Sequence, residues 1–295
     1  METREGNGRI RTIKKYWSIP IHGWLGILLV AIIWPLNWLL SGLRTHHLFF
    51  LLWLGYCLIV DAVVFMRTGT SLLQRDRRRY MRLFLLSMPA WWLFELSNAW
   101  VQNWIYVGRE FIPSWEYNLF SSLCFSTVMP AVLGTAELVS SFGWVKRVRP
   151  GPVIKPTLRV TTGFFIAGLT MLALLLVWPG YFFPFQWLWV FFILEPVNVW
   201  LGYRSLADGT QKGDWRPVLA LCLGALICGL FWEMWNYYSY PKWVYFVPFV
   251  DFLHIFEMPL LGYGGYLPFG LNVAALYHFL AGLMGDKEGY IKLGS

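Results

Sequence analysis

Two polar motifs with the same order of residue types recur in a chain that is otherwise rich in apolar residues. Each runs from a Glu-x-x-Asn pair through a Trp-x-Tyr sequence to a proline, an acidic residue and a Met-Pro pair. The first copy contains Glu95, Asn98, Trp104, Tyr106, Ile112, Pro113, Glu116, Met129 and Pro130. The second contains Glu233, Asn236, Trp243, Tyr245, Val247, Pro248, Asp251, Met258 and Pro259. Carboxyl and amide groups are costly among apolar helices, so they usually have a function there.

A spacing of three residues puts the glutamate and the asparagine of each pair on one helix face. A third such pair is formed by Glu195 and Asn198. A carboxylic acid kept neutral in a dry pocket is a proton donor, and the neighbouring amide could fix its orientation. We therefore predict Glu233 as a proton donor oriented by Asn236. The alternative is that these pairs are hydrogen-bonded struts between helices.

The second copy carries the fuller set of titratable groups. Asp251, His254 and Glu257 lie further along the chain than Glu233 and are three residues apart from one another. This spacing predicts that the three side chains share one helix face. Asp251 and Glu257 would act as bases or cation stabilisers, with Glu95 and Glu116 as partners from the first copy, and His254 could share a proton with either acid. A three-ligand metal site is conceivable here, but no second histidine joins it, so we expect no metal.

Aromatic residues surround the second glutamate. They include Trp232, Trp235, Trp243 and Tyr245. Such residues could form a belt at the membrane interface. They could also line a pocket in which their π-faces stabilise a cationic intermediate. We predict that these four residues, together with Asn98, Asn236, His254 and Glu195, contact the substrate.

The composition excludes several classes of protein. Of the 295 residues, 57% are hydrophobic, 14% are charged and 19 are tryptophans. Average globular domains have about 25% charged residues, so an integral membrane protein is predicted. The net charge of +8 arises from loop residues and is not a sign of nucleic-acid binding. Four cysteines in apolar runs and five scattered histidines give no cofactor motif, so no cofactor is expected.

Hydropathy predicts an all-α, polytopic fold with about eight transmembrane helices, because each span needs about 20 apolar residues. The candidate spans are 21–42, 48–66, 82–105, 117–140, 158–178, 184–203, 216–238 and 250–284. The last is interrupted by the glycine-rich run 261–268, so a half-helix, a break and a full span are expected. The first span is too long for a signal peptide and is expected to remain in the membrane.

The distribution of basic residues predicts the orientation of these spans. Arginine and lysine concentrate in segments 4–15, 67–82, 146–159 and 204–216. The intervening loops contain only Arg44, Arg109 and Lys242. Because cytoplasmic loops are enriched in basic residues, both termini are predicted to be cytoplasmic, in a multi-pass protein of the cell inner membrane.

The motif repeat divides the spans into four and four, which is the arrangement of a parallel internal repeat. The expected segments are a basic tail (1–16), a first repeat (17–145), a linker (146–156), a second repeat (157–285) and a C-terminal tail (286–295). Polar sites in such proteins tend to lie between the two halves.

The motifs resemble the lycopene cyclase domain of carotenoid biosynthesis, and are similar in style to carotenoid hydratases and membrane terpene cyclases. The matching residues are Glu95, Trp104, Tyr106, Pro113 and Glu116, and Glu233, Trp243, Tyr245, Pro248 and Asp251. The resemblance covers about 50 residues of each half. Where the family has an acid pair after the proline, Trp115 and Val250 replace its first member. It implies a repeated helical fold with a cofactor-independent acid–base site for a polyene or prenyl chain.

We therefore expect a membrane enzyme that acts on an isoprenoid or carotenoid-like lipid by proton-initiated cyclisation, isomerisation or hydration. A transporter or channel with carboxylates at mid-membrane depth has similar features. A non-catalytic lipid-binding scaffold is the third possibility. Membrane lipids and a hydrophobic substrate are the expected partners, and no nucleic acid is expected.

Overall fold

The computed structural model describes residues 18–286 and 289–293, and most of these residues are helical. The predicted basic tail at residues 1–16 lies outside the described residues. The long helices are α1 (Ile21–Leu39), α2 (Arg44–Thr68), α4 (Arg77–Val101), α5 (Ser114–Phe125), α6 (Val128–Ser140), α8 (Leu158–Val177), α10 (Trp189–Trp200), α12 (Arg216–Tyr237) and α13 (Tyr266–Leu283). The expectation of an all-α protein is therefore confirmed.

Short elements connect the long helices. The helical turns are α3 (Leu72–Arg75), η1 (Arg109–Phe111), α7 (Gly143–Lys146), α9 (Pro179–Phe182), η2 (Phe183–Trp187), α11 (Ala207–Thr210) and η3 (Leu260–Gly265). The short strands are β1 (Trp104–Val107), β2 (Lys242–Tyr245), β3 (His254–Ile255) and β4 (Met258–Pro259). They form two antiparallel pairs, β1 with β2 and β3 with β4.

Six helical segments of the described chain are long and apolar enough to cross a membrane. A seventh is obtained if the bent pair Pro179–Trp187 and Trp189–Trp200 counts as one span. These segments indicate a membrane protein. The one predicted span that falls outside this set is 82–105, which corresponds to α4. Its first turns carry four arginines, at positions 77, 78, 79 and 82, and these lower its hydropathy.

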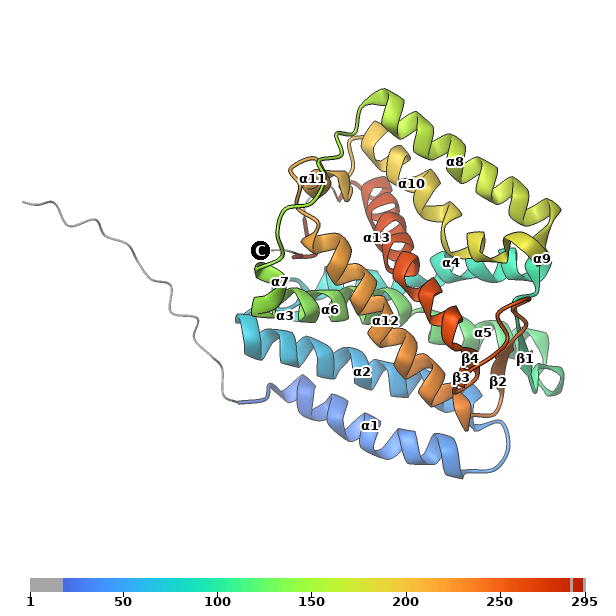
Figure 1. Cartoon of the computed structure of the whole chain (residues 1–295). Coiled ribbons are helices and arrows are strands. Elements are labelled where there is room, and N and C mark those ends of the chain that lie inside the picture. Colours follow the sequence, from blue (N-terminus) through green and yellow to red (C-terminus); the bar gives the residue numbers. More distant parts are fainter. Residues whose placement is uncertain (1–17, 287–288, 294–295) are drawn as a thin grey trace, which may run out of the picture.

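The short elements gather at the two opposite ends of the helices (Figure 1). The strands and α9 lie at one end, where the aromatic segments between the spans are found. The turns α3, α7 and α11 lie at the other end, within or beside the arginine-rich segments. The aromatic connections and the basic connections therefore lie at opposite ends of the helices, as expected from loops that alternate between basic and nearly uncharged along the sequence.

The chain before α13 differs from the expected half-helix. Residues 254–259 form the strands β3 and β4, and the glycine-rich run 261–268 begins the helix through η3. Phe249, Leu253 and Phe256 have left-handed φ angles of 68°, 51° and 59°, which no α-helix accommodates. Pro268 does not break α13, because it lies in the first turn, where its missing N–H is not needed.

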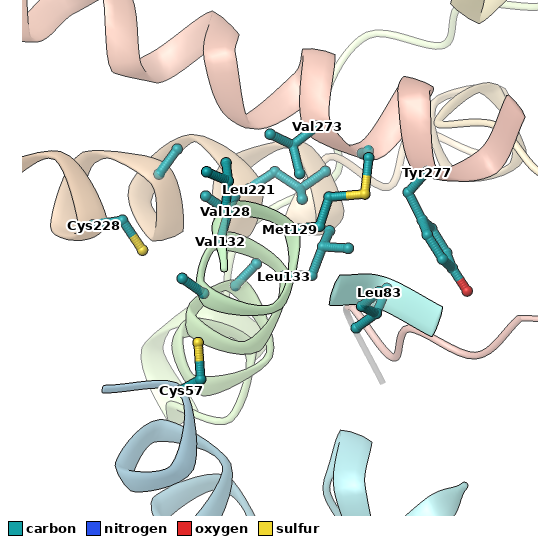
Figure 2. Close-up of a cluster of buried hydrophobic side chains, with 14 of the residues drawn as sticks. Cys57, Leu83, Val128, Met129, Val132, Leu133, Leu221, Cys228, Val273 and Tyr277 are labelled. Atoms are coloured by element: carbon teal, nitrogen blue, oxygen red, sulfur yellow. The ribbon is translucent and has the colours of Figure 1, made fainter. Parts of the chain in front are cut away.

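Helix α6 lies at the centre of the packed helices. Every residue of α6 except Leu138 is buried, and the helix packs against α2, α4, α12 and α13. Figure 2 shows Met129 and Leu133 of α6 close to Val273 of α13 and Leu83 of α4. Small residues allow helix backbones to approach closely in membranes, where such packing drives association.

Gly224 of α12 illustrates this close approach. A Cβ atom at this position would lie 2.7 Å from the backbone nitrogen of Ala136 in α6. We expect Gly224→Val to lower the free energy of unfolding by about 1–3 kcal/mol, as overpacked cores do. Gly163 of α8 is the matched control, since a Cβ there meets no atom within 4 Å. Thermal unfolding in detergent measures both, and equal stability of the two variants would contradict the prediction.

Candidate functional site

The asparagine of each Glu-x-x-Asn pair holds the backbone of the following tryptophan. The side chain of Asn98 donates to the carbonyl of Trp104 (2.8 Å) and accepts from its N–H (3.2 Å). Asn236 makes the same two bonds with Trp243, at 2.7 and 2.9 Å. The expected role of Asn236 in orienting Glu233 is therefore wrong: both polar atoms of its amide serve the backbone of β2.

The two Trp-x-Tyr segments form β1 and β2 and pair with each other. Trp104 lies opposite Tyr245, and Tyr106 lies opposite Trp243, in an antiparallel register. Each asparagine thus fixes the start of one strand, and the ladder between the strands joins the two motif copies. Backbone groups away from water need such partners, because an unpaired one is costly.

We expect Asn236→Ala to lower the free energy of unfolding by about 1–3 kcal/mol, because it leaves two backbone groups of Trp243 without partners. Asn98→Ala should have a similar effect on Trp104. Asn118→Ala on the exposed face of α5 is the control. Thermal melting of the purified variants measures the difference, and the idea fails if all three melt at the temperature of the native protein.

The glutamates accept hydrogen bonds from aromatic side chains. The Oε1 atom of Glu233 accepts from the hydroxyls of Tyr245 and Tyr266, both at 2.6 Å. The Glu233 side chain is fully buried, and its Oε2 atom has no hydrogen-bond partner among the described residues. The Nε1–H of Trp243 donates to the hydroxyl of Tyr245 at 2.8 Å, which completes a chain of donors leading to Glu233.

Glu95 has a corresponding environment. Its Oε1 atom accepts from the hydroxyl of Tyr106 (2.6 Å) and from the indole N–H groups of Trp91 (2.9 Å) and Trp104 (3.3 Å). Burial, and the neighbouring Glu95, raise the pKa of Tyr106 well above its ordinary value. Burial and Glu233 do the same to the pKa of Tyr245. Both phenols therefore keep their protons and act as donors.

An apolar cavity of about 150 Å³ lies between the two motif copies. Its lining is largely aromatic and comes from α2, α4, α5, α12, both paired strands and the start of α13. The aromatic lining residues are Phe49, Trp91, Trp104, Tyr106, Tyr117, Phe120, Phe125, Trp187, Trp232, Trp243, Tyr245, Tyr266 and Phe269. Glu233 is not among the lining residues, but Tyr245 and Tyr266, which bind it, are.

A second, more open and more polar pocket lies beside the first copy. It is lined by Glu95 together with Asn98, Gln102, Arg109 and Glu110. Trp104, Tyr106 and Tyr117 line both pockets. Glu95 therefore borders a polar opening on one side and contacts the walls of the apolar cavity on the other. Glu233 has no such opening among the described pockets.

The three predicted groups after the second copy do not come together. Asp251 and His254 are exposed and form a pair with 2.9 Å between Oδ1 and Nε2. Glu257 instead pairs with Lys242, a residue that lines the apolar cavity. None of the three lines the cavity itself. Their helical spacing has no structural consequence, because the segment is not a helix.

The remaining predicted residues occupy three different environments. Trp232, Trp243 and Tyr245 line the cavity as expected. Trp235 is buried in the core, with its ring 5.1 Å from that of Trp53. Glu195 lies outside the cavity, where its Oε1 atom accepts from the N–H of Ala207 at the start of α11 (3.0 Å).

Glu116 faces α2 rather than Glu95. Its Oε1 atom lies 3.3 Å from Nε2 of His46. No sequence signal points to His46, because its partner Glu116 lies 70 positions further along the chain. Tyr266 was also missed. It lies in the glycine-rich run that was interpreted only as a helix break, and its link to Glu233 spans 33 positions.

Comparison of the chain with protein-family models, curated proteins and solved structures finds no match. The geometry of the site therefore carries the functional argument.

Proposed function

We propose that this protein is an integral membrane enzyme that binds an isoprenoid or carotenoid-like chain in the apolar cavity and converts it by proton transfer. The reaction class is cyclisation, isomerisation or hydration. The observation that carries the proposal is an aromatic cavity whose wall includes tyrosine hydroxyls bonded to two glutamates, the buried Glu233 and the partly buried Glu95. Ligand sites are typically apolar with a few convergent polar groups, and this cavity has that character.

The proton would reach the substrate through a phenol. The O–H of Tyr245 or Tyr266, which donates to Glu233 in this structure, turns towards the substrate and protonates a carbon–carbon double bond, while the phenol oxygen accepts the carboxyl proton of the neutral Glu233. The new C–H bond leaves a carbocation, and the surrounding ring faces stabilise it. A neighbouring carbon then loses a proton to the oxygen of Tyr106, which passes its own proton to the Glu95 carboxylate, and this completes an isomerisation or a cyclisation of the substrate without any redox change. One proton has moved from Glu233 to Glu95, and it must return to Glu233 before the next turnover. Capture of the cation by water would give a hydration instead.

The two glutamates suit different halves of this cycle. Glu233 is fully buried and dry, as a proton donor needs to be. Glu95 borders the polar pocket, through which a proton can exchange with water. We therefore assign the base role to Glu95 rather than to Asp251, which is exposed and paired with His254.

A transporter is the second candidate function, because carboxylates at mid-membrane depth are also a feature of transporters. It requires a polar path that reaches the site from both membrane faces. The apolar cavity and its aromatic lining favour the enzyme, whereas the polar pocket at Glu95 is the one feature that favours transport.

We further propose eight spans in a parallel four-plus-four arrangement, with both termini cytoplasmic in the cell inner membrane. The antiparallel register of β1 and β2 supports it, since each tryptophan faces the tyrosine of the other copy. Asp61 and Glu195 add support. Asp61 accepts a hydrogen bond from the backbone N–H of Leu73 in α3 (2.9 Å), and Glu195 accepts one from the backbone N–H of Ala207 in α11 (3.0 Å). In both cases the donor lies twelve residues further along the chain, in the first turn of a short helix.

The test is lipid analysis of cells that express the native chain against cells with an empty vector, with mass spectrometry of the extracted isoprenoids. A product with the mass of its precursor, or with one added water, is the expected result. Unchanged lipids in a host that makes several isoprenoid precursors, together with ion or solute flux in vesicles, would favour the transporter. Unchanged lipids without flux would favour the scaffold.

A further inference from the structure

Two histidines and a glutamate meet beside the apolar cavity, at the contact between the first turns of α2 and α5. His46 and His47 belong to α2, and Glu116 belongs to the first turn of α5. One ligand atom from each lies within 4.8 Å of the others. The set is distinct from the groups around Glu95 and Glu233, because it shares no hydrogen bond with them among the described residues.

The packing of α5 on α2 brings the three groups together. The rings of His46 and His47 lie 4.8 Å apart, and both contact Phe120, at 4.6 and 5.0 Å. Phe120 and Glu116 are four residues apart and therefore share the face of α5 that meets the histidines. The carboxylate lies in the first turn of its helix, where the macrodipole favours its negative charge.

The Nε2 atom of His46 lacks a satisfactory partner. It is buried and makes no well-directed hydrogen bond among the described residues, although Oε1 of Glu116 lies 3.3 Å away. That separation is close to the distance of about 3.3 Å between two ligands of a tetrahedral zinc ion, which follows from bonds of about 2.0–2.1 Å. The widest separation, 4.8 Å, must close by about 1.5 Å. His47 is exposed and can make that movement by rotating its side chain.

We propose that His46, His47 and Glu116 bind a divalent transition-metal ion, with zinc as the best fit. Two imidazoles and one carboxylate are a donor set found in zinc sites that keep a fourth position open. His46 lines the apolar cavity, as do Phe120 and Ser121 of α5, so an ion at this site would lie at the edge of the cavity. Water on the open position would have a lowered pKa and would be available to a molecule in the cavity.

The test uses the full chain, purified in detergent with a tag that contains no histidine. The protein is treated with a chelator, dialysed and titrated with Zn²⁺, and its metal content is measured by mass spectrometry. Co²⁺ serves as a second probe, because its visible absorption reports tetrahedral coordination. The expected result is one bound ion per chain.

The variants are His47→Gln and Glu116→Gln, since both side chains reach the surface and their replacement leaves no cavity in the core. Each should weaken zinc binding by more than the roughly 10–100-fold that the loss of an outer-shell partner causes. His254→Gln, which alters an exposed histidine beside Asp251, should bind zinc as the native protein does. Zinc binding that is absent from the native protein, or equal in His47→Gln and the native protein, would overturn the proposal whatever the lipid analysis gives.

Discussion

Replacement of Glu233 by glutamine is expected to reduce conversion of the isoprenoid substrate by about 100-fold or more, which is the usual contribution of a positioned acid. Glutamine has nearly the same shape and can still accept from Tyr245 and Tyr266, so the protein should fold. It has no carboxyl proton to transfer. Product formed per amount of folded protein, measured by mass spectrometry of lipid extracts, gives the result.

Asp208→Asn controls for the change from acid to amide. Asp208 is a partly exposed residue that pairs with Arg204 near the opposite end of the molecule, so its variant should keep full conversion. Glu95→Gln should also slow the reaction, because the proton released by the substrate then has no carboxylate to receive it. Full conversion by Glu233→Gln would contradict the assigned role of this carboxyl group.

The second large effect is expected at the tyrosine that links Glu233 to the cavity. Tyr245→Phe keeps the ring in the cavity wall but removes the hydroxyl that donates to Glu233 and accepts from Trp243. We expect a fall in kcat of about tenfold or more with little change in KM, because the apolar contact surface is kept.

Tyr263→Phe is the matched control for this variant. The hydroxyl of Tyr263 donates to the carbonyl of Ile255 (3.0 Å), and the residue does not line the cavity. Its kcat should stay within about twofold of the native value, since the removed hydroxyl has no contact with the acid or the substrate. A fall in kcat of equal size in both variants would indicate a general effect on folding rather than an interrupted proton path.

The sequence was sufficient to predict most of the long helices and the two glutamates that gather tyrosine hydroxyls around them. Apolar runs of about 20 residues are a strong signal, since the bilayer sets their length. The recurrence of Glu-x-x-Asn before Trp-x-Tyr selected Glu95 and Glu233, whose hydrogen bonds to tyrosine are equivalent in the structure. Their catalytic role stays a prediction.

The partners of these groups could not be predicted, because they depend on contacts between distant segments. A spacing of three indicated that Asn236 would face Glu233, yet the backbone of β2 offered the amide two bonds at once. The same spacing indicated a helix through Asp251 and His254, but left-handed residues turn that segment into a loop and a hairpin. Local periodicity carries no information about such competition.

The pairing of β1 with β2 has a consequence for how the chain could have originated. Because each tryptophan lies opposite a tyrosine, a strand of this sequence is complementary to a second copy of itself. One half could therefore have formed an isologous homodimer, with two identical glutamates related by its symmetry axis. Joining the copies in one gene removes the requirement that they remain identical. One carboxyl group could then become sealed from water while the other kept its opening, which no symmetric dimer permits.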